Sequence, residues 1–170
     1  MVKSSLANHI NQMSLGDKRQ ILTLLEEREL AQMRESCQSN FLPFVQTMWS
    51  AFIEGDHHGT MADMFDRVAK GDLKRLIINM PPRHTKSEFA SHYLPAWFLG
   101  NYPDKKVIQT AHTAELAVGF GRKVRNLVNS PDYKKVFPEV SLQADSKAAG
   151  RWNTNKGGEY FAIGVGGAVT

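Results

Sequence analysis

The spacing of apolar residues in the first third of the chain predicts three helices. A stripe at helical spacing indicates a first helix over about residues 15–38, and Ser14 and Asp17 have the spacing of a capping box at its start. The stripe consists of Ile21, Leu24, Leu25, Met33 and Cys37. Residues 40–55 are rich in aromatic and branched side chains, so we expect a second, mostly buried helix with Pro43 near its beginning.

A turn over residues 55–59 separates the second helix from the third. Thr60 and Asp63 favour a helix start at this point, and Gly71 favours a helix end. Met61, Met64, Phe65 and Val68 share one face of this third helix. We therefore expect a short amphipathic helix that leads into the next segment.

The pattern then changes to a strand, a turn and a helix. Residues 75–80, Arg-Leu-Ile-Ile-Asn-Met, form a branched apolar run that predicts a buried strand. A polar turn follows, ends in Lys86 and Ser87, and leads into a helix predicted over residues 87–99, which Pro95 should bend or shorten.

A second strand and helix repeat this order. Residues 106–111 predict a strand, and residues 114–129 predict a helix that ends before Pro131. The alternation favours an α/β fold with a parallel sheet. Residues 151–154 and 159–163 flank Asn-Lys-Gly-Gly, which predicts a hairpin, and the glycine-rich residues 164–170 are expected to be flexible.

Composition adds limits without selecting a function. The 170 residues are 42% apolar, which suits one globular domain, and the net charge of +4 permits a polyanionic partner without requiring one. The single cysteine, Cys37, rules out an internal disulfide, and no Cys/His cluster has zinc-site spacing. The sequence shows neither a signal peptide nor a membrane-spanning apolar run, so we expect a cytoplasmic protein without membrane contact.

The strand, turn and helix around Lys86 have the order of a phosphate-binding loop. The free N–H groups at the helix start would bind phosphate, Lys86 would reach the β and γ phosphates, and the Ser87 hydroxyl would hold Mg²⁺. The usual motif is Gly-x4-Gly-Lys-Ser/Thr, but Met80 and Thr85 occupy the two glycine positions. An incidental Lys-Ser at a helix start is the competing interpretation.

Two further groups are candidates for ligand contacts. Gln46, His57 and His58 lie upstream of the loop, where a polar side chain can bind the adenine edge; the alternative is that the histidines cap a helix or face solvent. The helix over residues 114–129 carries three basic residues that are candidates for DNA contact, or simply a solvated face. They are Arg122, Lys123 and Arg125.

With these motifs, residues 41–170 resemble the large terminase subunit of tailed bacteriophages, the ATPase that drives DNA into the capsid. The resemblance rests on the run from Arg75 to Ser87, which contains Pro-Pro-Arg-His-Thr-Lys-Ser, on the region of Trp49 and the two adjacent histidines, and on the closing run from Gly158 to Thr170. Pro-Pro-Arg-His-x-Lys-Ser is characteristic of one branch of that family.

The resemblance implies a P-loop NTPase fold and a ring-forming motor that couples ATP hydrolysis, with Mg²⁺, to translocation of double-stranded DNA. It implies the portal protein and the small terminase subunit as partners, and work at the procapsid in the host cytoplasm. Residues 1–40 would form a helical extension that acts as a lid, and residues 41–170 the ATPase portion. The implied nucleotide-binding residues are Pro82, Arg83, His84, Thr85, Lys86 and Ser87, with Arg83 a candidate contact of the γ-phosphate.

The sequence lacks the acidic strand that such a motor needs. Phosphoryl transfer requires an acidic residue that positions the attacking water and another that holds the metal. Glu139, Asp145 and Glu159 do not follow an apolar run. We therefore expect an incomplete sheet and one part of a longer or split ATPase, without the nuclease domain of the family. A non-catalytic interaction module and a different P-loop enzyme, such as a helicase-like protein or a small-molecule kinase, are the alternatives.

Overall fold

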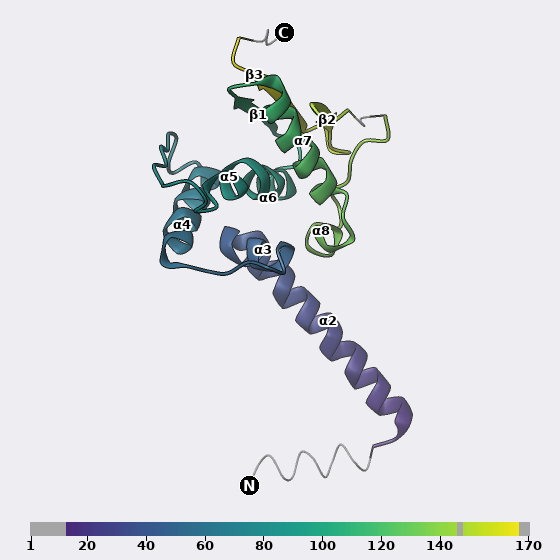
Figure 1. The fold of residues 1–170 in the computed structure, drawn as a ribbon. Helices are drawn as coiled ribbons and strands as arrows, with labels where there is room; N and C mark the ends of the chain where they lie inside the picture. The colour runs from purple at the N-terminus through teal and green to yellow at the C-terminus, as the bar shows by residue number, and fades with distance from the viewer. Residues whose placement is uncertain (1–12, 146–147, 167–170) are drawn as a thin grey trace. The chain divides into compact units, whose positions relative to one another are not determined.

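The computed structural model describes residues 13–145 and 148–166 and shows a mixed α/β protein (Figure 1). The chain divides into two compact units, one ending at Glu35 and one beginning at Ser36. Helix α2 (Leu15–Ser39) makes up most of the first unit, extends into the first residues of the second, and confirms the predicted helix. Ser14 Oγ accepts the Asp17 N–H at 3.1 Å and so caps its start.

The apolar stripe predicted for the first helix is exposed within the first unit. Ile21, Leu24 and Leu25 expose 38%, 57% and 48% of their surface, so these side chains have little packing among residues 13–35. Cys37, the last member of the stripe, belongs to the second unit and is buried there.

The second unit begins with two helices, α3 (Phe41–Met48) and α4 (Asp56–Lys70). Helix α4 starts five residues earlier than predicted, so the expected turn over residues 55–59 and the cap at Thr60 are wrong. Gly55 is the N-cap instead, because its carbonyl accepts the His58 N–H and its own N–H donates to His58 Nδ1, both at 2.9 Å. The predicted stop is confirmed, with Gly71 left-handed at φ 84°.

A continuous helical stretch follows the candidate loop. It consists of α5 (Lys86–Glu88), a π-helical turn (Phe89–Tyr93) and α6 (Leu94–Asn101). Pro95 was predicted to bend or shorten this helix, but the helical stretch is not shortened and continues to Asn101. Proline lacks an N–H, and the wider π turn directly before it is one way for a helix to continue past that missing donor.

Aromatic side chains hold the helices of the second unit together. Phe41 is fully buried and contacts three other rings edge-on, with centroid distances of 5.2 to 5.6 Å. These rings are Phe65, Phe89 and Trp97. Trp97 Nε1 donates to the Cys37 carbonyl at 2.7 Å, so this buried indole is also satisfied. The prediction that residues 40–55 are mostly core holds for Phe41, Phe44 and Val45, whereas Ile53 is 86% exposed.

Three strands form a small mixed sheet in the order β1-β3-β2. Strand β1 (Lys106–Ala111) pairs in parallel with β3 (Glu159–Gly164), and Ile108 lies opposite Phe161. Strand β2 (Arg151–Asn153) pairs antiparallel with β3, which confirms the predicted hairpin. The parallel pair β1 and β3 was not predicted, and the predicted parallel pairing of residues 75–80 with residues 106–111 does not occur, so the sheet is mixed.

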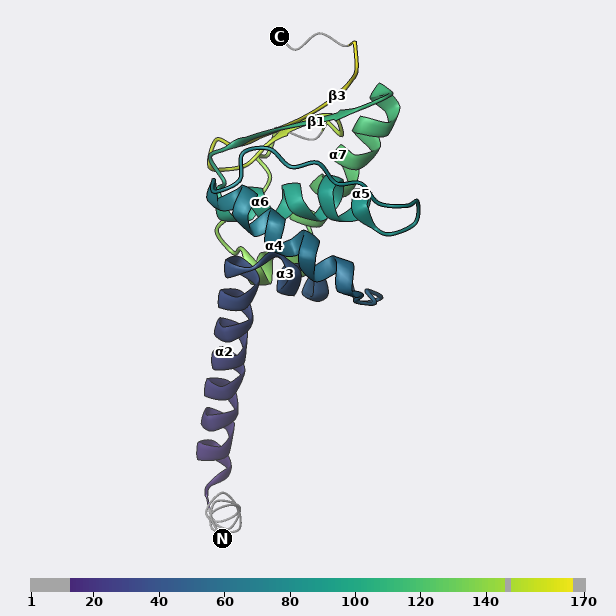
Figure 2. The same ribbon diagram turned by 90° about the vertical axis from the view of Figure 1, so that its left-hand side faces the viewer.

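The helices of the second unit lie mainly to one side of this sheet (Figure 2). Helix α7 (Ala114–Val128) confirms the helix predicted over residues 114–129. It packs against β1 and β3, and Thr113 Oγ1 accepts the Leu116 N–H at its start. The short helix α8 (Pro131–Val136), which was not predicted, follows it. On the opposite face of the sheet Ile108 is 59% exposed, so this face is only partly covered.

Two predictions about strands need correction. Residues 75–80 are not a buried strand: the segment carries no strand assignment, and Ile77 is 86% exposed. In the described chain the sheet has the order β1-β3-β2, so β1 is an edge strand and no strand pairs with residues 75–80. The expected flexible run also begins too early, because Gly164 is the buried last residue of β3; residues 167–170 lie outside the described residues.

The part of the chain that the structure describes contains no helix with the length and apolar character that spanning a bilayer requires.

Candidate phosphate-binding site

The loop over residues 80–87 has alternating backbone conformations. Arg83 and Thr85 have φ angles of 65° and 59°, and they are the non-glycine residues with positive φ in the described chain. His84, between them, does not share this conformation, and Lys86 begins α5. An alternation of left-handed and right-handed residues turns successive N–H groups toward one point, which is the geometry of an anion-binding nest.

Side chains of the loop bind its own carbonyl oxygens. Lys86 Nζ donates to the Pro81 carbonyl at 3.2 Å, and His84 Nδ1 donates to the Pro82 carbonyl at 2.9 Å. Thr85 Oγ1 donates to the His84 carbonyl at 2.7 Å. These contacts engage the loop carbonyls, while the first N–H groups of the following helix have no acceptor within the helix itself. The loop therefore presents donors and one ammonium group, which suits an anion.

The position of the loop agrees with that use. Figure 2 shows the loop before α5 on the side of the molecule where β1 and β3 end. In open α/β sheets ligands bind outside the carboxyl ends of the parallel strands. Ser87 is exposed at the helix start, where its hydroxyl is accessible to a metal ion bound to phosphate oxygens.

His58 is buried and connects α4 to the loop. Its side chain is 4% exposed, and its Nε2 lies 2.6 Å from Thr85 Oγ1. Its ring stacks on Phe89 with a centroid distance of 4.9 Å and meets Phe52 edge-on at 4.8 Å. Burial lowers the pKa of His58, and the neighbouring His57 lowers that pKa further. The neutral imidazole is therefore the form that the fold favours.

The three residues predicted to read adenine are not brought together. Gln46 is exposed and donates to Glu54 Oε2 at 2.7 Å. Both ring nitrogens of His58 are hydrogen-bonded, one to Gly55 and one to Thr85, so its described contacts are those of a helix cap and of a support for the loop.

His57 lines a hollow next to the segment that leads into the loop. The hollow, of about 330 Å³, is lined by residues of α4 and of the extended segment before the loop. The other lining residues are Thr60, Met61, Met64, Leu76, Ile77, Ile78, Asn79 and Met80. The Nε2 atom of His57 is buried and has no hydrogen-bond partner in the described structure. A mostly apolar hollow with few polar groups has the character of a site for a flat heteroaromatic ring.

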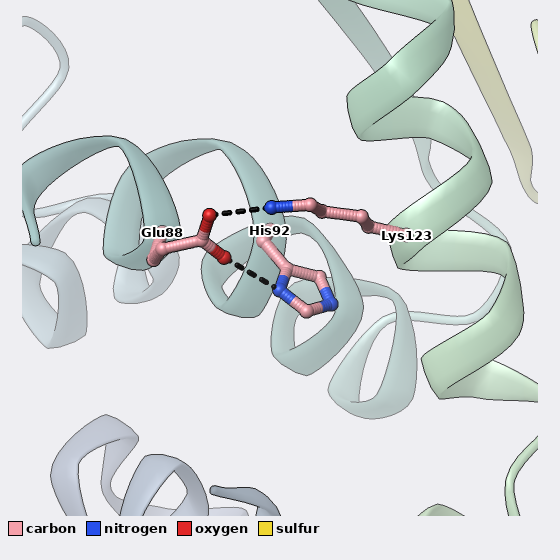
Figure 3. A network of polar contacts seen from close by, with 3 residues as sticks. All are labelled: Glu88, His92 and Lys123. Carbon is pink, nitrogen blue, oxygen red and sulfur yellow. Dashed lines mark hydrogen bonds and ion pairs between the residues drawn. The ribbon is translucent and has the colours of Figure 1, made fainter. Parts of the chain in front are cut away.

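A charged cluster that the sequence analysis missed lies directly after the loop. Glu88 accepts from Lys123 Nζ at 2.5 Å through one carboxylate oxygen, and its other oxygen lies 3.1 Å from His92 Nδ1 (Figure 3). Burial raises the pKa of Glu88, but the hydrogen bonds from Lys123 and His92 outweigh that effect and lower it overall. The four-residue spacing of Glu88 and His92 was a usable signal; nothing local indicated Lys123.

The basic residues proposed for DNA contact differ in their surroundings. Lys123 is engaged by Glu88, and Arg125 Nη2 donates to Asn126 Oδ1 at 3.3 Å. Arg122 is exposed on the same helix. The three side chains thus do not form one uniform basic stripe.

The three acids weighed in the sequence lie in turns or at the start of a strand. Glu139 and Asp145 are exposed and lie in turns. Glu159 begins β3, at the end of the strand opposite Gly164, and pairs with Arg151 at 2.6 Å and Lys106 at 3.7 Å. Residues 13–145 and 148–166 contain no cluster of three or more His, Cys, Asp or Glu side chains arranged to hold a metal ion.

Comparison of the chain with models of protein families, with curated proteins and with solved structures finds no match.

Proposed function

We propose that this chain binds ATP and Mg²⁺ through residues 80–87, as the nucleotide-binding part of the large terminase subunit of a DNA-packaging motor. The observation that carries the proposal is the alternation of positive φ at Arg83 and Thr85 directly before Lys86 at the start of a helix. Backbone N–H groups then surround the phosphates, and the P-loop NTPase fold is the architecture that uses such a loop.

Each residue of the loop has a role in this proposal. Lys86, which now donates to the Pro81 carbonyl, swings to the β and γ phosphates, and Ser87 binds Mg²⁺ together with phosphate oxygens. Arg83, which is exposed, approaches the γ-phosphate in this proposal. The adenine ring occupies the hollow lined by His57 and by residues 76–80.

Binding and hydrolysis separate in this proposal. Glu139 and Asp145 lie in turns and Glu159 begins β3, so none of these three acids follows an apolar strand. The proposal therefore takes the residue that activates water from a completing segment or chain. The chain alone therefore binds nucleotide with slow or no turnover. Double-stranded DNA, the portal protein and the small terminase subunit are the partners of the complete ring, in the host cytoplasm.

Calorimetric titration with ATP and Mg²⁺ tests the proposal. Lys86→Ala should weaken binding by roughly 10- to 100-fold, because a charged donor to phosphate is worth about 1.5–3 kcal/mol. Lys74→Ala is the matched control, since Lys74 is an exposed lysine outside the loop. Equal affinities of the wild type and Lys86→Ala would show that the loop is not the binding site. Rapid ATP turnover by the wild type would contradict the claim that the catalytic acid is missing.

The exposed apolar residues of the first unit favour a second candidate, a non-catalytic interaction module. Ile21, Leu24 and Leu25 share one face of α2 and expose 38%, 57% and 48% of their surface. A helix with such a face suits docking to a protein partner, here the portal or the small terminase subunit. Binding to a purified partner that survives Lys86→Ala but fails with Leu24→Lys would favour this candidate.

A further inference from the structure

Thr85 adopts a backbone conformation that its side chain disfavours. Its φ of 59° and ψ of 1° lie in the left-handed region, which is costly for a residue branched at Cβ. Glycine takes this conformation without strain and is the usual residue before the lysine of a phosphate loop. The structure must therefore hold Thr85 in place by other means.

A chain of hydrogen bonds runs from α4 to Thr85. The Gly55 N–H donates to His58 Nδ1 at 2.9 Å, so Nδ1 is the unprotonated nitrogen. Nε2 of the neutral ring then carries the hydrogen and donates to Thr85 Oγ1 at 2.6 Å, while Thr85 Oγ1 donates to the His84 carbonyl at 2.7 Å. Every donor in this chain has one acceptor, so the arrangement is self-consistent.

The ring that makes this contact has little freedom to move. His58 is 4% exposed and contacts the rings of both Phe52 and Phe89, and the start of its own helix is fixed by the bond to Gly55. Phe89 itself is fully buried. A donor immobilised in this way loses little entropy when it binds Thr85, so the bond is well suited to fix the loop.

We propose that His58 is a positioning residue of the phosphate-binding loop, and that its bond to Thr85 holds the backbone conformation that glycine supplies in other such loops. Thr85 and His58 thus act as one unit in place of the second glycine of the motif. The role in phosphate binding rests on the function proposed above, whereas the coupling between the two residues does not.

Nucleotide affinity in a double-mutant cycle tests the positioning role. His58→Leu should weaken ATP binding by roughly three- to tenfold, the usual range for one buried hydrogen bond. His58→Gln should restore most of the affinity, because a Gln amide can place a donor near the Nε2 position. In a Thr85→Gly background His58→Leu should change affinity less than twofold, since glycine needs no support at this φ. Equal losses in both backgrounds would overturn the proposal.

Unfolding by urea without nucleotide separates this proposal from the function it serves. Thr85→Val keeps the branched shape and removes the hydroxyl, so it should destabilise the wild type. In the His58→Leu background the same substitution should have little effect on stability, which corresponds to a coupling of roughly three- to tenfold in the unfolding constant. Additive effects would exclude the bond as a support of the loop. If the variants show this coupling but the wild type binds no ATP, the phosphate-binding function is refuted and the coupling between His58 and Thr85 is still supported.

Discussion

Lys123 Nζ on α7 lies 2.5 Å from Glu88 Oε1, two residues beyond the candidate phosphate-binding lysine. The same carboxylate contacts His92 at 3.1 Å, so one acidic side chain joins the helix after the loop to the helix that covers the sheet (Figure 3). Lys123 thus has a structural role as the partner of Glu88, whereas its neighbour Arg122 does not belong to this cluster.

Removing the lysine of this cluster should destabilise the protein modestly. Lys123→Met should lower the free energy of unfolding by about 0.5–1 kcal/mol, because the pair is partly exposed and solvent weakens it. Arg122→Met on the same helix is the control and should change the free energy by less than about 0.5 kcal/mol. Urea unfolding measures both. A larger loss for Arg122→Met than for Lys123→Met would contradict the assignment.

DNA binding should respond in the opposite order. Arg122 is exposed, whereas Glu88 already neutralises Lys123. If α7 contacts the DNA backbone, Arg122→Ala should weaken duplex binding and lower the slope of affinity against salt by about 1, while Lys123→Ala should change both less. Fluorescence anisotropy with duplex DNA at several salt concentrations measures this. An unchanged slope for both variants would remove α7 from the DNA interface.

The buried histidine predicts a pH dependence of stability. The folded pKa of His58 lies below its ordinary value of 6.5, so the unfolded chain takes up the proton first as pH falls. The contribution of His58 is therefore fully present above pH 6.5 and is lost as pH falls from there through the folded pKa. His57 and Glu54 are the charged neighbours that act on this equilibrium, with opposite signs.

Urea unfolding at about pH 7.5 and about pH 5.5 measures the effect. The wild type should lose more stability between these two values than His58→Gln, which cannot take up a proton. His92 has a lowered pKa as well, so some dependence should remain in His58→Gln. Identical losses in the two proteins would show that His58 does not contribute.

Two glycines of α7 should respond oppositely to alanine. A Cβ on Gly119 would meet open space, so Gly119→Ala should stabilise the helix by about 0.5–1 kcal/mol. A Cβ on Gly121 would overlap the Ala149 carbonyl and press on Tyr160, so Gly121→Ala should destabilise by about 1–3 kcal/mol. Thermal unfolding compares the pair. A stabilising Gly121→Ala would show that this close packing is wrong.

Local pattern was sufficient for most of the helices. Apolar spacing predicted α2 and α7, and Gly71 predicted the end of α4. These features depend on contacts within a few residues along the chain, so they can be predicted from the sequence pattern. The start of α4 was misplaced because Gly55 and His58 form a cap that lacks the usual Ser or Thr signature.

The sequence by itself determined which residues form the candidate loop: the order of Lys86 and Ser87 after an apolar run is readable without coordinates. Only the tertiary structure decided that this run stays unpaired, that His58 supports Thr85 and that Glu88 binds Lys123. The residues of these two pairs are 27 and 35 positions apart. Their contact follows from the packing of α4 and α7 against the helix after the loop, and no local period in the chain encodes that packing.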